Sequence, residues 1–525
     1  MGDDSIYDLI VVGGGMGGLA TAALVQRFGL RVALLEAHTK LGGCAGYFGR
    51  ECFTFDAGAT ALMGLNPGEP IGDLLTTLGV DLPTASTPGY RVHLPDRSFE
   101  LGTEPGQFER ESSSVFPDHP RAGRAFWRLQ EAVGGTLFRA AGQIPRMPVA
   151  RVADLWHDLR ILGLSGVLAG TLAFMTVQDV LRLFRLDRDR SFRSLIAMLL
   201  QDTAQAGPES VPFANAAACL QAYRLGLRRP LGGMKRLVEG IGHRLGELGG
   251  DLRTACLVDA IDRQGPGEFA VVTRRRERLR TRQVAMNLPL DIAARLLGRP
   301  LTGSLGRSER QSRPAWSAFT GYLAIARERI PDDSPLFHHV LQSYDAPTHD
   351  GNNVLISLSA PDDEGYGPSD VRVATLSTHT EPVSWTSLDR AAYAAKKADY
   401  RRRLLGALET ALPGASGALV HEEFATPRSF ARYTRRSEGA VGGAPMSRWN
   451  SNFLSVGSDL LGPGLWVVGD SVFPGQGTMA TVLSAIRVVE RITGIRWEKS
   501  RSQYGGGKSD SLGQSERTEI RRRGG

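Results

Sequence analysis

Residues 7–18 read Tyr-Asp-Leu-Ile-Val-Val-Gly-Gly-Gly-Met-Gly-Gly, a short apolar run that leads directly into a glycine cluster. The run Tyr7 to Val12 is rich in β-forming residues and bounded by glycine, which predicts a buried parallel strand. A helix-forming run follows from Leu19 to Phe28, and a second strand is expected from Arg31 to Leu35. A strand, a G-x-G-x-x-G turn and a helix in this order are typical of a dinucleotide site. The sequence therefore predicts a Rossmann-type α/β domain with a doubly wound parallel sheet.

The residues of this turn have separate physical tasks. Gly13 permits the tight turn, Gly15 lets the backbone approach the pyrophosphate, and Gly18 lets the helix and the strand pack closely. The free N–H groups and the dipole at the start of the helix, where Met16 and Gly17 lie, attract phosphate. We therefore expect all five residues to belong to the cofactor site.

The second strand ends at Glu36, eighteen residues past Gly18. An acid at this place can accept hydrogen bonds from both ribose hydroxyls of an adenosine, and it disfavours a 2′-phosphate. We place Glu36 and the following Ala37 in the same site. Gly42 and Gly43 form a second small-residue turn that can wrap the pyrophosphate from its other side, as in large two-domain FAD proteins. This turn favours FAD over NAD as the cofactor, with an ordinary glycine loop as the alternative.

A second part of the site is expected near the carboxyl end of the chain. Residues 464–470 read Gly-Leu-Trp-Val-Val-Gly-Asp, an apolar strand that ends in an acid able to bond a ribitol hydroxyl, and a helical run follows from Thr478 to Thr493. The positive end of that helix would face the flavin N1 region, where negative charge develops when flavin accepts a hydride. An ordinary strand-turn-helix that closes the sheet is the alternative. The cofactor residues expected from this segment are Gly469, Asp470, Gly477, Thr478 and Met479.

The length of the chain and the distribution of its charges indicate how it is organised. At 525 residues it is longer than one hydrophobic core usually supports, so two connected domains are expected. Of the net charge of +7, more than half lies between Arg496 and Gly525, in a segment rich in Gly and Ser without periodic apolar residues. This composition predicts a disordered basic tail over residues 495–525. A second basic run, Arg274 to Arg282, is expected to be a solvated hairpin. No recognisable nucleic-acid module accompanies either run, so nucleic acid is not expected as a partner.

The cysteines and the first residues indicate the compartment. Cys44, Cys52, Cys219 and Cys256 form neither a metal-type spacing nor a dense disulfide framework, so no metal site is expected and a reducing compartment fits. The chain begins with acidic residues and runs straight into a strand, without the pattern of a signal or transit peptide. We therefore expect a cytoplasmic protein.

An uncharged stretch from Ile161 to Gln178 bears on membrane contact. It is near the minimum length of a bilayer span, but glycine, serine and threonine dilute it. Three interpretations remain open: a buried or channel-lining helix, an interfacial helix that dips into a membrane, and a true span. The basic and apolar continuation Leu181 to Arg185 supports the interfacial helix.

Seven segments of the chain together resemble one known family. They are Gly13 to Gly18, Glu36, Gly42-Gly43, Phe53 to Gly58, Pro230 to Met234, Asn287 to Pro289, and Val468 to Gly477. From residue 7 to about residue 494 the chain resembles the bacterial-type phytoene desaturases and carotenoid isomerases, flavoproteins related to the amine oxidases. The resemblance implies an FAD-dependent oxidoreductase that acts on a long apolar polyene. It places Val258 at a backbone contact to adenine, and Cys44, where many relatives carry arginine, is interpreted as a small residue near the cofactor.

Other stretches bear on the reaction. Those similar to the carotenoid 3,4-desaturases are Phe174 to Val177, Pro335 to His339, and Thr426 to Phe430 with Val441 to Gly443, whereas the turn Asp470 to Gly477 is equally similar to the carotenoid cis–trans isomerases. The resemblance implies a desaturase that introduces a C-3,4 double bond into an acyclic carotenoid by hydride transfer to flavin. A cis–trans isomerase or polyene saturase, a phytoene desaturase, and an amine oxidase with a polar substrate are the alternatives.

The order of the segments implies a discontinuous domain organisation. The FAD-binding domain is expected over residues 1–110, 226–302 and 439–494, and a substrate-binding α+β domain over residues 111–225 and 303–438. Helices over a sheet would form an apolar tunnel for the hydrocarbon. A tunnel mouth on the bilayer would spare a water-insoluble polyene an aqueous crossing, so we expect a helical membrane-facing part and peripheral association with the inner membrane.

The expected chemistry requires few side chains. Loss of a hydride next to a conjugated chain leaves a delocalised cation that loses a proton readily, so a strong general base is not required. The sequence shows no evident catalytic triad, which suits a reaction carried by flavin. No residue pattern identifies the electron acceptor.

Overall fold

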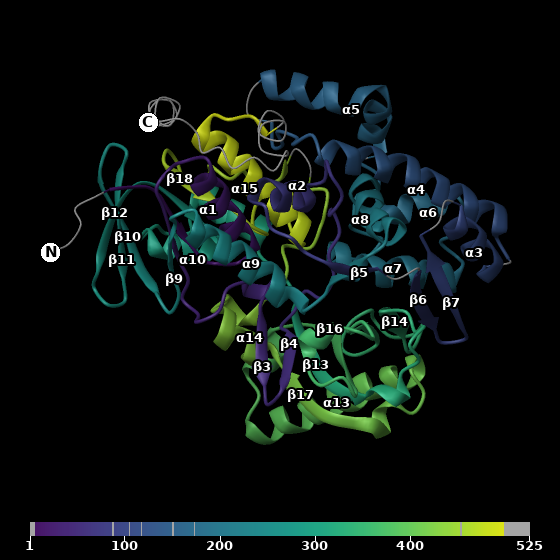
Figure 1. The fold of residues 1–525 in the computed structure, drawn as a ribbon. Helices are drawn as coiled ribbons and strands as arrows, with labels where there is room; N and C mark the ends of the chain where they lie inside the picture. Colours follow the sequence, from purple (N-terminus) through teal and green to yellow (C-terminus); the bar gives the residue numbers. More distant parts are fainter. Residues whose placement is uncertain are drawn as a thin grey trace.

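The computed structural model describes residues 6–86, 89–103, 106–116, 118–149, 152–172, 174–451 and 454–497. They form two seven-stranded sheets and a largely helical part (Figure 1). Strands and helices from the first and the last parts of the chain lie side by side in the first sheet and its covering layer, whereas the second sheet is built mainly from the middle of the chain.

The first sheet contains the predicted parallel strands and an added antiparallel hairpin. β1 (Tyr7–Val12) lies between β2 (Val32–Leu35) and β12 (Arg278–Met286), and all three run parallel. The other strands are β9 (Asp251–Arg253), β10 (Val258–Gly265), β11 (Glu268–Thr273) and β18 (Leu465–Val467). Every residue of β1 is buried, as its apolar run predicts for a strand covered on both faces. The basic run forms the exposed turn between β11 and β12 and the outer half of β12.

Three helices cover one face of this sheet, namely α1 (Met16–Arg27), α9 (Gly233–Glu247) and α15 (Thr478–Thr493). α1 packs against both of the others. Successive side chains of a strand point to opposite faces, so Leu9 and Val11 join the core under these helices, whereas Ile10 and Val12 join the core on the other face. β1 is therefore covered on both faces.

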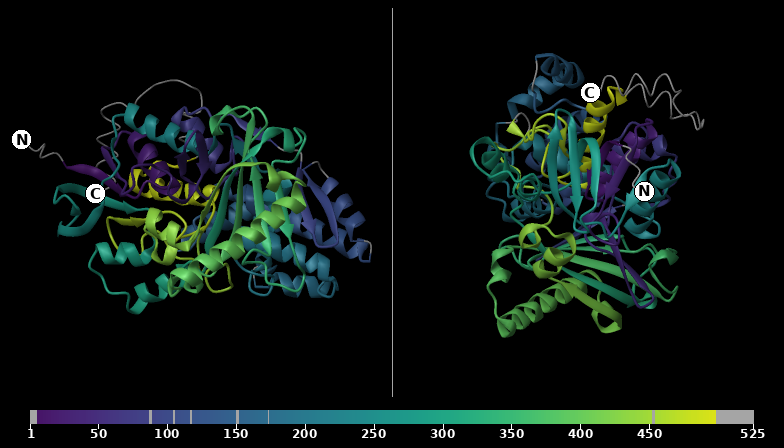
Figure 2. Two further views of the ribbon diagram at one scale, coloured as in Figure 1. Left: turned by 90° about the horizontal axis from the view of Figure 1, so that it is seen from below. Right: turned by 90° about the vertical axis from the view of Figure 1, so that its left-hand side faces the viewer.

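The second sheet has the strand order β17-β13-β16-β15-β14-β6-β7. Its strands are β6 (Gly89–Leu94), β7 (Arg97–Gly102), β13 (Ser317–Ala326), β14 (Phe337–Leu341), β15 (Asn353–Leu358), β16 (Val371–Thr380) and β17 (Leu419–Ala425). The long helix α13 (Arg390–Ala411) lies across one face of it and shares a core with it (Figure 2). β6 and β7 fall within residues 1–110, which we expected in the FAD-binding domain, yet they belong to this sheet, where β6 pairs with β14 and β7 with β6.

The helical part lies beside both sheets. It consists of α3 (Gln107–Val115), α4 (Pro120–Ala141), α5 (Val152–Leu172), α6 (Val177–Leu183), α7 (Arg190–Ala204) and α8 (Phe213–Leu225). The smaller helices are α2 (Pro70–Leu78), α10 (Leu290–Leu296), α11 (Gly303–Ser312), α12 (Val383–Thr386) and α14 (Pro427–Thr434). The remaining strands are β3 (Tyr47–Arg50), β4 (Phe53–Asp56), β5 (Thr84–Ser86) and β8 (Arg228–Pro230).

The uncharged stretch from Ile161 to Gln178 is not one helix. α5 is kinked at Gly163, whose φ of 60° and ψ of −165° are not helical, and it ends at Leu172; α6 then begins at Val177 behind a Thr176 capping box. Among the residues that the structure describes, no helix has the length and apolarity needed to cross a bilayer. α5 lies at the outer edge of the molecule, above α4 and α8 in Figure 1.

Residues 495–497 are the part of the predicted basic tail that the structure describes. Ile495 packs against the core under α1, and Trp497 is 1% exposed within that core. Burial of the indole surface holds these residues against α15. The charge pattern of the segment did not predict this packing. The rest of the predicted tail, residues 498–525, lies outside the described residues.

A buried ion pair between β4 and β8 connects α9, which covers the first sheet, to β15 of the second sheet. Asp56 at the end of β4 and Arg229 in β8 have fully buried side chains, and their Oδ2 and Nη2 atoms are 3.1 Å apart. The Asp56 carboxylate also accepts hydrogen bonds from the Met234 N–H of α9 at 2.8 Å and from the Tyr366 hydroxyl at 2.7 Å. Arg229 donates further to Ser357 of β15. The ion pair thus links α9 on the first sheet to β15 in the second sheet, and it includes the last residue of the segment Phe53 to Asp56.

Candidate functional site

A cavity of about 1670 Å³ runs from the glycine turn of β1 into the space between the helical part and the second sheet. Small-molecule sites measure roughly 300–1,000 Å³, so this cavity has room for a large cofactor and a second molecule. The residues expected in the cofactor site that line it are Gly13, Gly15, Met16, Gly17, Glu36, Ala37, Gly42, Gly43, Val258, Asp470, Gly477, Thr478 and Met479.

Gly18 and Gly469 lie just behind this lining. A Cβ on Gly18 would stand 2.0 Å from the carbonyl oxygen of Gly13, so the residue permits the close packing of α1 on the turn. Gly469 has a φ of +103°, and a Cβ there would stand 2.5 Å from the side-chain oxygen of Asn287. The Asn287 side chain also abuts Gly15 and Gly17. Asn287 lies in one of the segments that carried the resemblance, but its place between both halves of the site is a property of the tertiary structure.

Two small-residue turns face each other at the start of α1. Gly15 and Gly42 form a β-bridge, and the Gly42 N–H donates to the Gly14 carbonyl at 2.8 Å. Gly42 has a φ of +108°, in the region that favours glycine, and a Cβ on Gly43 would stand 3.4 Å from the Gly15 Cα. No side chain from these residues fills the space between the turns, so backbone N–H groups and the start of α1 are available to a pyrophosphate.

Glu36 is held by backbone donors at the end of β2. Its two carboxylate oxygens accept from the N–H groups of Gly14 and His38, each at 2.6 Å. Burial raises the pKa of Glu36 above its ordinary value, and the two N–H donors act against this by favouring the charged form. The Glu36 carbonyl accepts from the Cys256 N–H at 2.8 Å, which brings the segment leading to Val258 next to the carboxylate. A carboxylate fixed in this way keeps lone pairs for the ribose hydroxyls of an adenosine.

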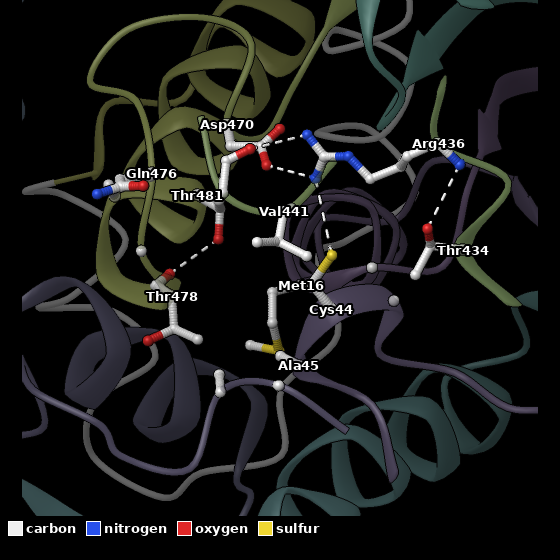
Figure 3. A pocket seen from close by; sticks show the side chains of 18 of the residues that line it. Met16, Cys44, Ala45, Thr434, Arg436, Val441, Asp470, Gln476, Thr478 and Thr481 are labelled. Carbon is white, nitrogen blue, oxygen red and sulfur yellow. Dashed lines mark hydrogen bonds and ion pairs between the residues drawn. The ribbon is translucent and has the colours of Figure 1, made fainter. Parts of the chain in front are cut away.

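Arg436 completes the other half of the site, and no pattern in the sequence pointed to it (Figure 3). Its Nη1 lies 2.6 Å from the Asp470 carboxylate and 3.7 Å from the Cys44 sulfur, and its Nη2 donates to the Gly442 carbonyl at 2.9 Å. Burial would lower the pKa of Arg436, but Asp470 and Cys44 raise it above its ordinary value, so the guanidinium stays charged. Cys44 was expected to be a small residue at the cofactor, and in the structure it lines the cavity beside this cation.

The far part of the cavity has mostly apolar walls. Residues from α4, α5, α8, the connection after α8 and β15 contribute Leu137, Phe138, Ile161, Leu162, Ala218, Ala222, Leu227 and Leu355. A small polar group interrupts these walls, formed by Asp202 of α7, Tyr223 of α8 and His379 of β16. His338 and His339 are both buried in β14. Within the described ranges no three His, Cys, Asp or Glu side chains are grouped as metal ligands.

These observations fit FAD. The paired glycine turns admit a pyrophosphate, Glu36 stands where an adenosine ribose would end, and α15 begins at Thr478 behind Gly477, whose φ is +97°. α15 has sixteen residues, so its amino end carries the partial positive charge of a full helix. The residues that would hold the cofactor are thus those of the two turns, Glu36, Val258, Asp470 and the start of α15.

Replacing Glu36 with alanine is expected to weaken FAD binding by roughly 1–3 kcal/mol, the worth of hydrogen bonds to a charged acceptor, which corresponds to about a 5- to 150-fold rise in Kd. Flavin fluorescence titration of the apoprotein measures this. The control is Glu268→Ala, which removes a carboxylate paired with Arg280 on the hairpin β11–β12. Equal FAD affinities of the two variants would mean that the adenosine does not lie at Glu36.

Comparison with known proteins agrees with this geometry. A model of the family described as flavin-containing amine oxidoreductase matches residues 16–493. The chloroplastic prolycopene isomerase of Arabidopsis thaliana is 25% identical over 94% of this chain and 83% of that protein. The lycopene-forming phytoene desaturase of Paracoccus sp. strain N81106 is 25% identical over 91% of this chain and 95% of that protein. A triple mutant of putrescine oxidase is similar in fold, with a TM-score of 0.63 and 15% identity over 92% of this chain and 97% of that one.

Proposed function

The chain belongs to the flavin-containing amine oxidoreductase family and is an FAD-dependent oxidoreductase, and on this premise we propose that it desaturates an acyclic carotenoid near its end group. Its relatives include a prolycopene isomerase and a lycopene-forming phytoene desaturase. Bound FAD supplies the acceptor for a hydride. The stretches similar to the 3,4-desaturases, Phe174 to Val177, Pro335 to His339 and Thr426 to Phe430, favour the C-3,4 position.

The observation that carries this proposal is the continuity of the cavity. One cavity joins the turns that fit FAD to a chamber walled by apolar residues of α4, α5 and α8. A long hydrocarbon gains free energy from leaving water for such a chamber, roughly in proportion to the apolar area removed from water. Polar side chains also line the cavity, among them Asp158, Asp202 and Asn215, and the apolar residues of α4, α5 and α8 provide the surface that would take up a hydrocarbon.

The experiment that tests the proposal is the mass of the product. The gene is expressed in hosts that make phytoene, neurosporene, lycopene or hydroxylated acyclic carotenoids, and the pigments are analysed by mass spectrometry. A desaturase lowers the pigment mass by two hydrogens per turnover and shifts its absorption to the red, because conjugation lengthens. Consumption of phytoene alone would shift the assignment to a phytoene desaturase. Products of unchanged mass would overturn desaturation.

A second candidate is cis–trans isomerisation. It is favoured by the prolycopene isomerase of Arabidopsis thaliana, whose similarity covers 94% of this chain. In the same pigment experiment an isomerase gives a product of equal mass with a changed chromatographic retention, and a saturase gives a product two hydrogens heavier.

We further propose that α5 lies on the cytoplasmic surface of the inner membrane. Val152, Leu155, Trp156 and Leu159 are spaced three and four residues apart, so they form one face of α5, and all four are exposed, Val152 at 73% and Trp156 at 69%. Ile161 and Leu162, farther along α5, line the cavity. Phe174, 72% exposed just past the end of α5, extends the apolar surface. A polyene could thus pass from lipid to the cavity along this helix.

Charging this surface is expected to release the protein from vesicles. In the variant with Trp156→Glu and Phe174→Glu, two large apolar side chains no longer enter the lipid, each worth about 1.5–3 kcal/mol, so partitioning falls by more than about ten-fold. Co-sedimentation with liposomes, with and without anionic lipid, measures the change. The matched control carries Val383→Glu and Val420→Glu, which are equally exposed apolar residues in α12 and β17. If both variants sediment like the unmodified protein, α5 does not contact the membrane.

A further inference from the structure

A carboxyl group and two imidazoles meet at the edge of the substrate chamber. Asp202 lies near the end of α7, and its carboxylate oxygens are 3.2 Å from His339 Nε2 of β14 and 3.4 Å from His379 Nδ1 of β16. Asp202 and His379 line the cavity, with side chains 17% and 15% exposed, whereas His339 lies behind them and is fully buried. The carboxyl therefore has one imidazole on the protein side and one on the cavity side.

This group is adjacent to the part of the cavity that fits the flavin. The side-chain amide of Gln476 donates to the carbonyl of Thr203 at 2.7 Å and to that of Asp202 at 3.4 Å. Gln476 directly precedes Gly477 and α15, whose start is expected at the flavin ring. Gln205, which directly follows α7, donates to the Val441 carbonyl, beside the segment that carries Arg436. The end of α7 is thus fixed to the flavin loop, and Asp202 faces the space between that loop and the apolar walls.

The surroundings of Asp202 keep a proton exchangeable near neutral pH. The titratable groups that face it from the neighbouring elements are Tyr90 of β6, Cys219 and Tyr223 of α8, His339 of β14, and His379 of β16 with His349 behind it. Burial raises the pKa of Asp202 to about 7. Burial lowers the pKa of His339 to about 3 and that of His379 to about 4, so both imidazoles are neutral. The Tyr90 hydroxyl lies 3.0 Å from His339 Nδ1 and fixes that ring.

We propose that Asp202 is the group that exchanges a proton with the substrate beside the flavin, with His379 as its partner on the cavity side. The inference rests on the proposed function. In desaturation, one C–H bond would break and its electron pair would leave as hydride, for which FAD held by the two glycine turns and the start of α15 would supply the two-electron acceptor. The neighbouring C–H bond breaks as its proton forms an O–H bond with the Asp202 carboxylate, and its electron pair becomes the new C=C bond. In a reaction run towards saturation, the same carboxyl donates the proton.

The test compares the holoenzyme with its Asp202→Asn variant, using a polyene that the unmodified protein converts in the pigment experiment. The cation left by hydride loss needs no strong base, but a positioned proton acceptor of moderate strength still contributes roughly 10²–10⁴-fold. The variant is therefore expected to lose at least about 10²-fold in kcat, with FAD content and KM little changed. In the desaturation direction the carboxylate is the active form, so the rate of the unmodified protein rises as pH increases through about 7. The variant lacks this rise. A variant that keeps both the rate and the pH dependence overturns the proposal.

A readout without substrate separates this inference from the proposed function. The infrared C=O band of a protonated carboxylic acid is expected to disappear between pH 6 and pH 8 in the unmodified holoenzyme, and to be missing at both values in the Asp202→Asn variant. Asp350→Asn is the matched control, because Asp350 pairs with His349 at 2.8 Å without lining the cavity. If no polyene is converted but this band titrates, the proposed function fails and the proton-exchanging carboxyl stands. If the band is unchanged in the variant, the inference fails.

Discussion

Replacing Gly18 with alanine is expected to abolish FAD binding. The added methyl group would stand 2.0 Å from the carbonyl oxygen of Gly13 and 3.1 Å from the Asn287 Cβ, and the first of these atoms is backbone that cannot turn aside. Overpacking typically costs about 1–3 kcal/mol and occasionally more, and we expect a cost at the upper end or above it because the clash is with backbone. The cost falls on the turn that must hold the pyrophosphate. FAD affinity should therefore fall by more than roughly 100-fold.

The flavin absorbance of the purified variant measures this loss, and circular dichroism reports whether the helices remain. Gly246→Ala is the control, because Gly246 lies in α9 with nothing within 4 Å of an added Cβ. That substitution is expected to leave the flavin content unchanged and to stabilise the helix slightly, since alanine orders at a lower entropic cost. A Gly18→Ala protein with full flavin content would mean that α1 can move away from the turn.

Replacing Arg229 with methionine is expected to destabilise the protein by about 3–5 kcal/mol, the range for removal of one partner from a buried ion pair. Asp56 would remain fully buried, with the Met234 N–H and the Tyr366 hydroxyl as its partners and no opposing charge. The side chain of Arg229 also bridges to Ser357 of the second sheet, so the loss falls on the junction between the two parts of the molecule.

Urea unfolding, followed by tryptophan fluorescence and by FAD release, measures the effect. The first control is Arg50→Met, which removes an exposed guanidinium bound to Glu423 and should cost less than about 1 kcal/mol. The second carries both Asp56→Asn and Arg229→Met and should recover part of the lost stability, because the buried group is then neutral. Equal stability of the single variant and the unmodified protein would show that water or a neighbouring side chain neutralises Asp56.

The cofactor half of the site was largely accessible from the sequence. The segment Tyr7 to Gly18, the acid Glu36 and the helix beginning at Thr478 encode their structure locally. An apolar run of this length becomes a buried strand, a glycine supplies a positive φ or a close approach, and a helix starts where the glycines end. The observed bounds, Tyr7–Val12 for β1 and Thr478–Thr493 for α15, agree with those expectations.

The substrate half depended on the tertiary structure. Arg436 reaches Cys44 across 392 positions of sequence, and Asp202, His339 and His379 belong to a helix and two strands that the tertiary structure brings together. The local sequence pattern also did not predict that β6 and β7 join the second sheet, or that α5 is kinked at Gly163. Local periodicity specifies which face of an element is buried, but the partner across a cavity is set by the path of the whole chain. The sequence alone therefore determined a dinucleotide-binding flavoprotein, and the tertiary structure decided which charged and titratable groups stand beside its flavin.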